Sequence, residues 1–93
     1  MSAQKLARLY RVRGRVQGVG FRYFVEHAAN ALGLTGWVRN RDDGDVEVYA
    51  AGNSAQLAEL AGMLRKGPPW SEVRGVDESE APIERHQSFF IRH

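Results

Sequence analysis

A phosphate-binding loop is indicated by one segment near the N-terminus, Gly14-Arg15-Val16-Gln17-Gly18-Val19-Gly20-Phe21-Arg22. Glycines let successive backbone N–H groups turn toward one ligand, because they lack a Cβ and tolerate left-handed backbone angles. A helix that begins after the loop adds unpaired N–H groups and a positive dipole end. The planar guanidinium of an arginine can hold two phosphoryl oxygens at once. We therefore expect the phosphate-binding loop to consist of Gln17, Gly18, Val19, Gly20, Phe21 and Arg22.

The loop differs from two common nucleotide-binding motifs. Gly18 and Gly20 supply G-x-G, but Tyr23 stands where a dinucleotide fingerprint requires a third glycine. Phe21 and Arg22 follow Gly20, where the P-loop of nucleoside triphosphatases requires a lysine and a Mg²⁺-binding hydroxyl. The sequence therefore predicts neither a dinucleotide nor a metal-bound triphosphate as ligand.

No other group in the sequence marks a catalytic centre. There is no cysteine, no metal-binding histidine spacing and no serine between glycines. The acids of Asp42-Asp43-Gly44-Asp45 are expected to shape a turn, and His27, His86 and His93 are expected on the surface. A phosphate site without metal, cofactor, nucleophile or base suits a substrate whose leaving group needs no proton. Acyl phosphates fit, because they release a carboxylate.

Hydrophobic periodicity predicts the elements on either side of the loop. Tyr10, Val12 and Val16 share one parity, which is typical of a strand with one buried face. After the loop, apolar residues recur at helical spacing, and Gly33 stands where such a helix would end. These apolar residues are Phe21, Phe24, Val25, Ala28, Ala29 and Leu32. The loop is therefore expected at a strand-to-helix joint.

Two further strands are expected at residues 35–41 and 45–51, around a hairpin turn at Asp42-Asp43-Gly44. Asn53 is expected to cap a second helix, which ends at Gly67-Pro68-Pro69.

Two short strands near residues 72–79 and 87–92 complete the pattern. These elements contain the order βαββαβ, which predicts an α+β fold with an antiparallel sheet and both helices on one face.

The phosphate-binding loop, followed by Gly36-Trp37-Val38-Arg39-Asn40 and an Asp43-Gly44 hairpin, resembles the acylphosphatase family. The resemblance extends over roughly residues 8 to 92, and the two blocks with their spacing are far more specific than either alone. It implies a ferredoxin-like sandwich that hydrolyses the carboxyl-phosphate anhydride of acyl phosphates to carboxylate and inorganic phosphate. The family's catalytic arginine falls on Arg22, and its water-positioning asparagine falls on Asn40.

The amide of Asn40 suits that role, because it can both donate and accept hydrogen bonds. It can orient an attacking water but is too weak a base to take the proton. We therefore expect the proton to go to a phosphoryl oxygen of the substrate, while Arg22 and the loop stabilise the transferring group.

Composition favours one compact, mildly basic domain. The chain has 93 residues, no cysteine, a net charge of +2 and a pI near 9.4. This length supports one modest core, so we expect a single domain over residues 1–93, with its core at about 8–92. No apolar run approaches the ~20 residues of a membrane span, and nothing requires an oxidising compartment. We expect a cytoplasmic monomer that binds neither membranes nor nucleic acid.

Arginines are concentrated in the first quarter of the chain, at positions 8, 11, 13, 15 and 22. This concentration favours an anionic ligand near the N-terminal half. Taken one at a time, Arg8, Arg11 and Arg13 are expected only to solvate an open sheet face.

Two alternative functions remain open at this stage. The first is an RNA-recognition module, because the segment Gln17–Phe24 half-matches the aromatic strand motif of such modules. Gln17 stands where that motif has a basic residue, and Val19 stands where it has a base-stacking aromatic. The second is a carbamoyl-phosphate-processing relative, such as the acylphosphatase-like domain of larger hydrogenase-maturation proteins.

Overall fold

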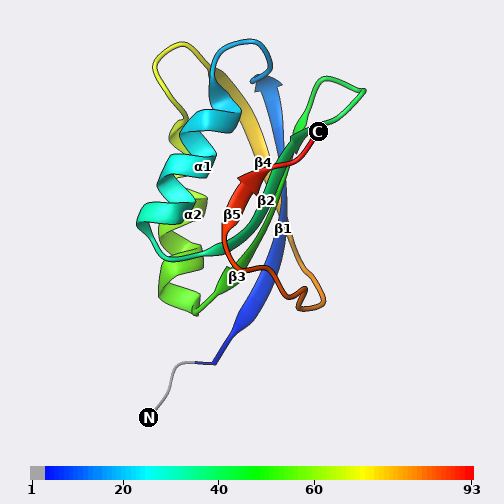
Figure 1. Cartoon of the computed structure of the whole chain (residues 1–93). Helices are drawn as coiled ribbons and strands as arrows, with labels where there is room; N and C mark the ends of the chain where they lie inside the picture. Colours follow the sequence, from blue (N-terminus) through cyan, green and yellow to red (C-terminus); the bar gives the residue numbers. More distant parts are fainter. Residues whose placement is uncertain (1–3) are drawn as a thin grey trace.

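The computed structural model describes residues 4–93, so the first three residues of the expected domain lie outside the described part. Five strands form one sheet, and two helices cover one of its faces (Figure 1). The elements are β1 (Leu6–Arg15), α1 (Phe21–Ala31), β2 (Thr35–Asn40), β3 (Val46–Gly52), α2 (Ser54–Lys66), β4 (Glu72–Glu80) and β5 (Phe89–Ile91). The strand order is β4-β1-β3-β2-β5. The predicted α+β, ferredoxin-like arrangement with both helices on one face is confirmed.

The sheet departs from the prediction in one strand pair. β1 is antiparallel to β3 and β4, and β2 is antiparallel to β3, as expected. β5 instead runs parallel to β2, with Gly36 opposite Phe89 and Val38 opposite Ile91. The expectation of a wholly antiparallel sheet was therefore wrong for this pair. After β4 at one edge the chain crosses to the opposite edge, and that crossover leaves no signal in the apolar pattern of a short strand.

β1 ends directly before the predicted loop. Its inward side chains Tyr10 and Val12 are fully buried, and Val16 just beyond the strand is buried as well. The β1–β4 register shifts between Arg13 and Gly14, where the backbone bulges. Gly14 has a φ of 129°, and a Cβ there would clash with the carbonyl of Glu72, so the bulge requires glycine.

The helices begin in different ways. α2 has the predicted capping box: the Asn53 side chain accepts from the Gln56 N–H at 2.8 Å, and the Gln56 side chain accepts from the Asn53 N–H at 2.8 Å. α1 begins after Gly20, which is left-handed and provides no side-chain cap. The N–H groups of the first turn of α1 therefore stay available to a ligand.

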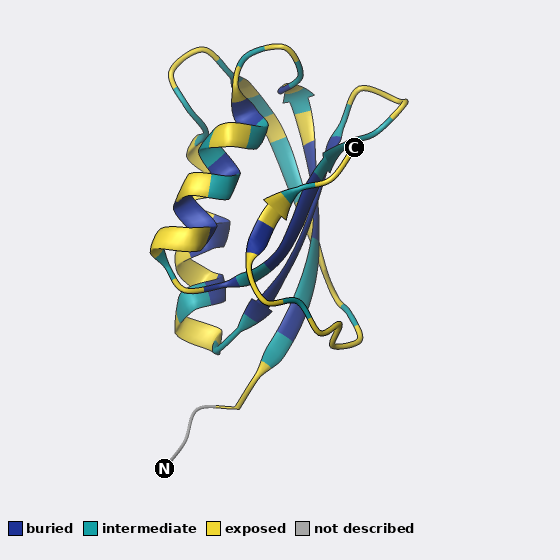
Figure 2. Ribbon diagram, in the orientation of Figure 1, coloured by how far each residue is buried: buried dark blue, intermediate teal, exposed yellow. Residues whose placement is uncertain are grey.

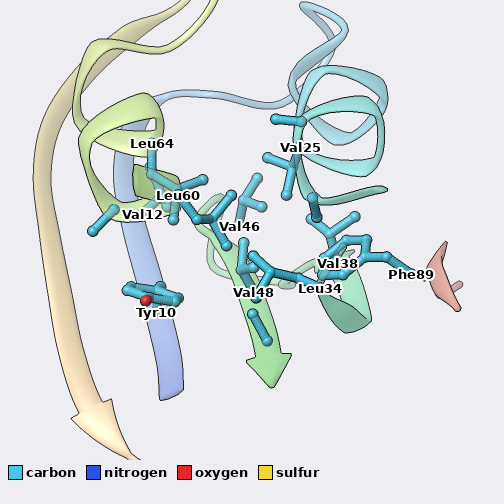
Figure 3. Packing of buried hydrophobic residues seen from close by; sticks show 14 of the residues in the cluster. Tyr10, Val12, Val25, Leu34, Val38, Val46, Val48, Leu60, Leu64 and Phe89 are labelled. Carbon is cyan, nitrogen blue, oxygen red and sulfur yellow. The ribbon is translucent and has the colours of Figure 1, made fainter. Parts of the chain in front are cut away.

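The core fills the space between the helices and the sheet. Figure 2 shows buried residues on the inward faces of both helices and along the central strands. Valines and leucines of the sheet and both helices form one cluster with Tyr10 and Phe89, and Tyr10 lies at one side of it (Figure 3). Burial raises the pKa of Tyr10 to about 12, and its hydroxyl donates to the Leu57 carbonyl at 3.2 Å. Within this core α1 packs against β2 and β5.

The opposite face of the sheet carries a smaller cluster in which Trp37 stacks on Tyr49 with ring centroids 5.8 Å apart. The segment between β4 and β5 closes over it. The Tyr49 hydroxyl donates to the Pro82 carbonyl at 2.7 Å, and the Trp37 indole donates to Glu84 at 3.1 Å. Trp37 is therefore a core residue of this face. Among the described residues, no helix is long and apolar enough to cross a membrane.

Candidate active site

A pocket of about 200 Å³ opens where the end of β1, the start of α1 and the end of β2 meet. It lies at the end of the sheet that also carries the β2–β3 hairpin, at the top of Figure 1. Its lining residues are Val16, Gly18, Gly20, Phe21, Arg22, Tyr23 and Asn40. The tertiary structure thus brings Arg22 and Asn40 to one pocket, although they come from different elements.

The backbone on one side of this pocket is shaped by Gly18 and Gly20. Their φ angles are 72° and 78°, in the left-handed region that favours glycine. A Cβ at either position would meet nothing within 4 Å, so the space above the loop is open to a ligand. The first hydrogen bond of α1 runs from the Phe24 N–H to the Gly20 carbonyl at 3.1 Å. The N–H groups of residues 21–23 precede it and have no helical acceptor.

Arg22 is the second residue of α1 and is half-buried at the pocket. Within residues 4–93 its guanidinium forms no ion pair with a carboxylate, and the first turn of α1 contains no acidic residue. An unpaired guanidinium beside free backbone donors and a helix N-terminus gives a site with strong preference for an anion.

Asn40 is the last residue of β2. Its side-chain oxygen Oδ1 is buried and accepts no hydrogen bond from the part of the chain that the structure describes. Buried acceptors are almost always paired, so this oxygen marks a position where a water molecule or ligand can donate a hydrogen bond. It lies at the pocket that Arg22 also lines.

Three of the predicted loop residues have side chains directed elsewhere. Phe21 is 1% exposed and belongs to the core, and Val19 packs against the core edge. The side-chain amide of Gln17 donates to the carbonyls of Arg41 and Asp45 at 2.8 and 3.0 Å. Gln17 and Val19 do not line the pocket, so their contribution to phosphate binding stays a prediction.

Val16 and Tyr23 also line the pocket, although sequence reasoning did not assign either residue to the site. Val16 carried the signal of a core residue, and it is indeed only 1% exposed. Tyr23 is 70% exposed on the first turn of α1, and its place directly after Arg22 was the one available signal.

The other titratable candidates lie outside this pocket. His27 and His93 are exposed, and His86 on the open sheet face contacts Glu84 at 2.8 Å. Asp43 shapes the hairpin as expected: the Asp45 N–H donates to it at 3.1 Å.

That backbone hydrogen bond, followed by the one from the Arg41 guanidinium, holds the pKa of Asp43 below its ordinary value. Residues 4–93 contain no cluster of three histidine, aspartate or glutamate side chains arranged to hold a metal ion.

The RNA-recognition alternative is not favoured. Its motif requires aromatic residues on a strand that faces the nucleic acid, but Phe21 and Phe24 lie on α1 and pack toward the core.

The fold and the pocket define a small α+β sandwich with a pocket at the joint between its first strand and first helix. The family model for acylphosphatase matches residues 8–91, and the chain belongs to the acylphosphatase family. Members of this family hydrolyse acyl phosphates to a carboxylate and inorganic phosphate, and this is the activity of the chain.

Individual relatives agree. The acylphosphatase of Solibacter usitatus is 62% identical over 92% of this chain and 90% of its own length. The crystal structure of acylphosphatase from Bacillus subtilis is 43% identical with a TM-score of 0.91, covering 95% of this chain and 99% of that one. The acylphosphatase structure from Coxiella burnetii is 39% identical, also with a TM-score of 0.91, over 95% and 93% of the two chains. These matches extend over nearly the whole length of each relative. The chain also matches 12% of the full-length HypF structure, at 24% identity and a TM-score of 0.89, and this likeness shows the fold alone.

Proposed function

We propose that the loop at residues 17–22 binds the phosphoryl group of the acyl phosphate through backbone N–H groups and the Arg22 guanidinium. Within residues 4–93 the N–H groups at the start of α1 have no backbone acceptor, and two left-handed glycines leave the space above them open. Arg22 then offsets the charge on the equatorial oxygens as the phosphoryl group transfers. This arrangement supplies position and charge, which are what phosphoryl transfer chiefly requires.

Asn40 orients the attacking water in this proposal. Its buried, unpartnered Oδ1 accepts a hydrogen bond from the water and directs a lone pair of the water oxygen toward phosphorus. The bond from the water oxygen to phosphorus forms as the bond from phosphorus to the carboxylate oxygen breaks. The proton of the water passes to a phosphoryl oxygen, because no general base lines the pocket. The carboxylate leaves unprotonated.

The main observation behind this mechanism is that Arg22 and Asn40, each without a partner among the described residues, line the same pocket. Arg22 forms no ion pair within residues 4–93, and Asn40 presents an orphaned buried oxygen. A buried acceptor rarely stays unpaired, and an arginine beside free backbone donors at a helix N-terminus is well placed to bind an anion.

Steady-state hydrolysis of benzoyl phosphate beside p-nitrophenyl phosphate, with and without EDTA, tests the chemistry. We expect hydrolysis of the anhydride at least ~100-fold faster than that of the ester, because no residue protonates the poorer leaving group. EDTA should leave the rate unchanged. Equal rates on both substrates, or inactivation by EDTA, would contradict a metal-free mechanism that depends on a carboxylate leaving group.

The same proposal treats residues 1–93 as one domain that works as a monomer in the cytoplasm, without nucleic acid or membrane partners. All groups that we assign to the reaction come from one chain, so the site needs no second copy. Sedimentation at micromolar concentration, with activity per chain measured over a dilution series, tests the monomer directly.

A further inference from the structure

We propose that Gln17 is a positioning residue: it ties the phosphate-binding loop to the base of the β2–β3 hairpin and thereby sets Asn40 relative to the bound phosphoryl group. This inference rests on the function proposed above for Asn40 and the loop.

Both hydrogens of the Gln17 amide nitrogen are used. Its Nε2 donates to the Arg41 carbonyl at 2.8 Å and to the Asp45 carbonyl at 3.0 Å. Both partners are acceptors only, so the nitrogen of the amide must face them and both of its hydrogens are used. The Gln17 amide nitrogen therefore has no hydrogen left for a phosphate.

The two acceptors lie at the base of the hairpin. Arg41 follows Asn40 directly, and Asp45 directly precedes β3. The Arg41 N–H donates to the Asp45 carbonyl at 2.8 Å and closes the hairpin. Gln17 binds both arms at this point. Within the described residues, its two bonds are the only side-chain hydrogen bonds that join the loop at residues 16–20 to this hairpin.

Sheet topology explains why such a tie is needed. The loop follows β1 and Asn40 ends β2, but β3 lies between these strands. The backbone hydrogen bonds of the sheet therefore connect the loop to Asn40 only through β3. Gln17 instead bonds to Arg41, the residue directly after Asn40, without going through β3. In-line attack depends on this alignment, and a displacement of about 1 Å can lower the rate by about 100-fold.

The first test is Gln17→Met, which removes both donors and keeps the length of the side chain. We expect kcat for benzoyl phosphate to fall about 10- to 100-fold, while the inhibition constant of inorganic phosphate changes less than about threefold. The matched control is Arg11→Met. Arg11 reaches the same hairpin from the open sheet face, through Asp43 at 2.6 Å and Asp45 at 2.7 Å. Its kcat should stay within about threefold of wild type.

A double-variant cycle separates positioning from general destabilisation. Once Asn40→Ala has removed the oriented water, Gln17→Met should lower kcat by less than about threefold further. The inference would be overturned if the double variant lost kcat by the product of the two single-variant losses. It would also be overturned if phosphate inhibition of Gln17→Met weakened in proportion to kcat. Near-normal kcat for Asn40→Ala alone would instead contradict the proposed function. Impaired Asn40→Ala with normal Gln17→Met would contradict only the role of Gln17.

A third test uses Gln17→Glu, whose kcat is compared at two pH values in the same folded protein. Its result does not depend on whether Gln17→Met is stable. The carboxylate repels both carbonyls at neutral pH, but once protonated it donates one hydrogen bond again. The ratio of its kcat to that of wild type should therefore rise at least ~threefold between about pH 7.5 and pH 5. A ratio that does not depend on pH would overturn the proposal.

Discussion

Three arginines on the open face of the sheet pair with carboxylates, whereas Arg22 at the pocket does not within the described part of the chain. On the open face of the sheet the pairs are Arg11–Asp43, Arg13–Asp77 and Arg39–Glu47. At the pocket, Arg22 has no carboxylate partner among residues 4–93, and the first turn of α1 contains no acid. The same type of side chain therefore pairs with the protein's own carboxylates in one region and is left without one in the other.

The difference shows that the concentration of arginines in the sequence does not by itself locate the site. Arg13 finds its partner Asp77 at 3.0 Å although 64 residues separate them along the chain. An arginine becomes a binding group where pairing fails and backbone donors lie close by.

The largest effect is expected for Arg22→Lys, which keeps a charge but loses the bidentate fork. We expect kcat/KM for benzoyl phosphate to fall at least ~100-fold, in line with ~3 kcal/mol for a group that stabilises the transition state. Inhibition by inorganic phosphate should weaken as well. The matched control is Arg13→Lys on the open face, where kcat/KM should stay within about twofold. Near-normal kinetics for Arg22→Lys would show that the loop is structural.

The second effect is expected for Asn40→Ala. Because this side chain is assigned to the water, kcat should fall about 100-fold while the inhibition constant of inorganic phosphate stays within about threefold. Asn30→Ala is the control, since the Asn30 amide is occupied by the Phe89 backbone at 3.2 and 3.3 Å. That variant should lose about 1 kcal/mol of stability and keep its kcat. Phosphate binding that falls as steeply as kcat in Asn40→Ala would contradict its assignment to the water.

Smaller effects are expected for the histidines, because none of them lines the pocket. His27→Ala, His86→Ala and His93→Ala should each keep kcat within about threefold, and the wild-type rate should show no histidine-like inflection between about pH 6 and 7.5. A pH–rate profile of each variant checks both points. One folded but inactive histidine variant would require a general base and end the substrate-assisted mechanism.

The smallest effect concerns stability on the open face. Hydrogen bonds from His86 and then Trp37 hold the pKa of Glu84 below its ordinary value of 4.5. A lowered folded-state pKa means that this contribution is complete above about pH 4.5 and is lost as the pH falls through the folded-state value. The Glu84 side chain is 47% exposed, so we expect only about 0.5 kcal/mol.

Urea unfolding of wild type and Glu84→Gln measures this contribution. The two proteins should differ more at about pH 7 than at about pH 3, with equal activity at neutral pH. An equal difference in the free energy of unfolding at both pH values would show that the charge of Glu84 contributes nothing.

Local features of the chain could be predicted because their causes lie within a few residues. The strand-to-helix joint follows from a change of apolar period at the loop, and the left-handed Gly18 and Gly20 follow from glycine's freedom in φ. The capping box at Asn53 and Gln56 needs only a spacing of three residues. Arg22 and Asn40 could be assigned to one site only through the family resemblance, because their positions in the sequence do not show how close they lie in space.

Contacts across the fold could not be predicted, because they depend on where distant strands pair. The parallel direction of β5 follows from a crossover to the far edge of the sheet. The sequence marks Gln17 as one more loop residue, but only the packing of the hairpin beside the loop directs its amide to two carbonyls. Likewise, whether a guanidinium forms an ion pair depends on whether the folded chain brings a carboxylate within about 4 Å of it.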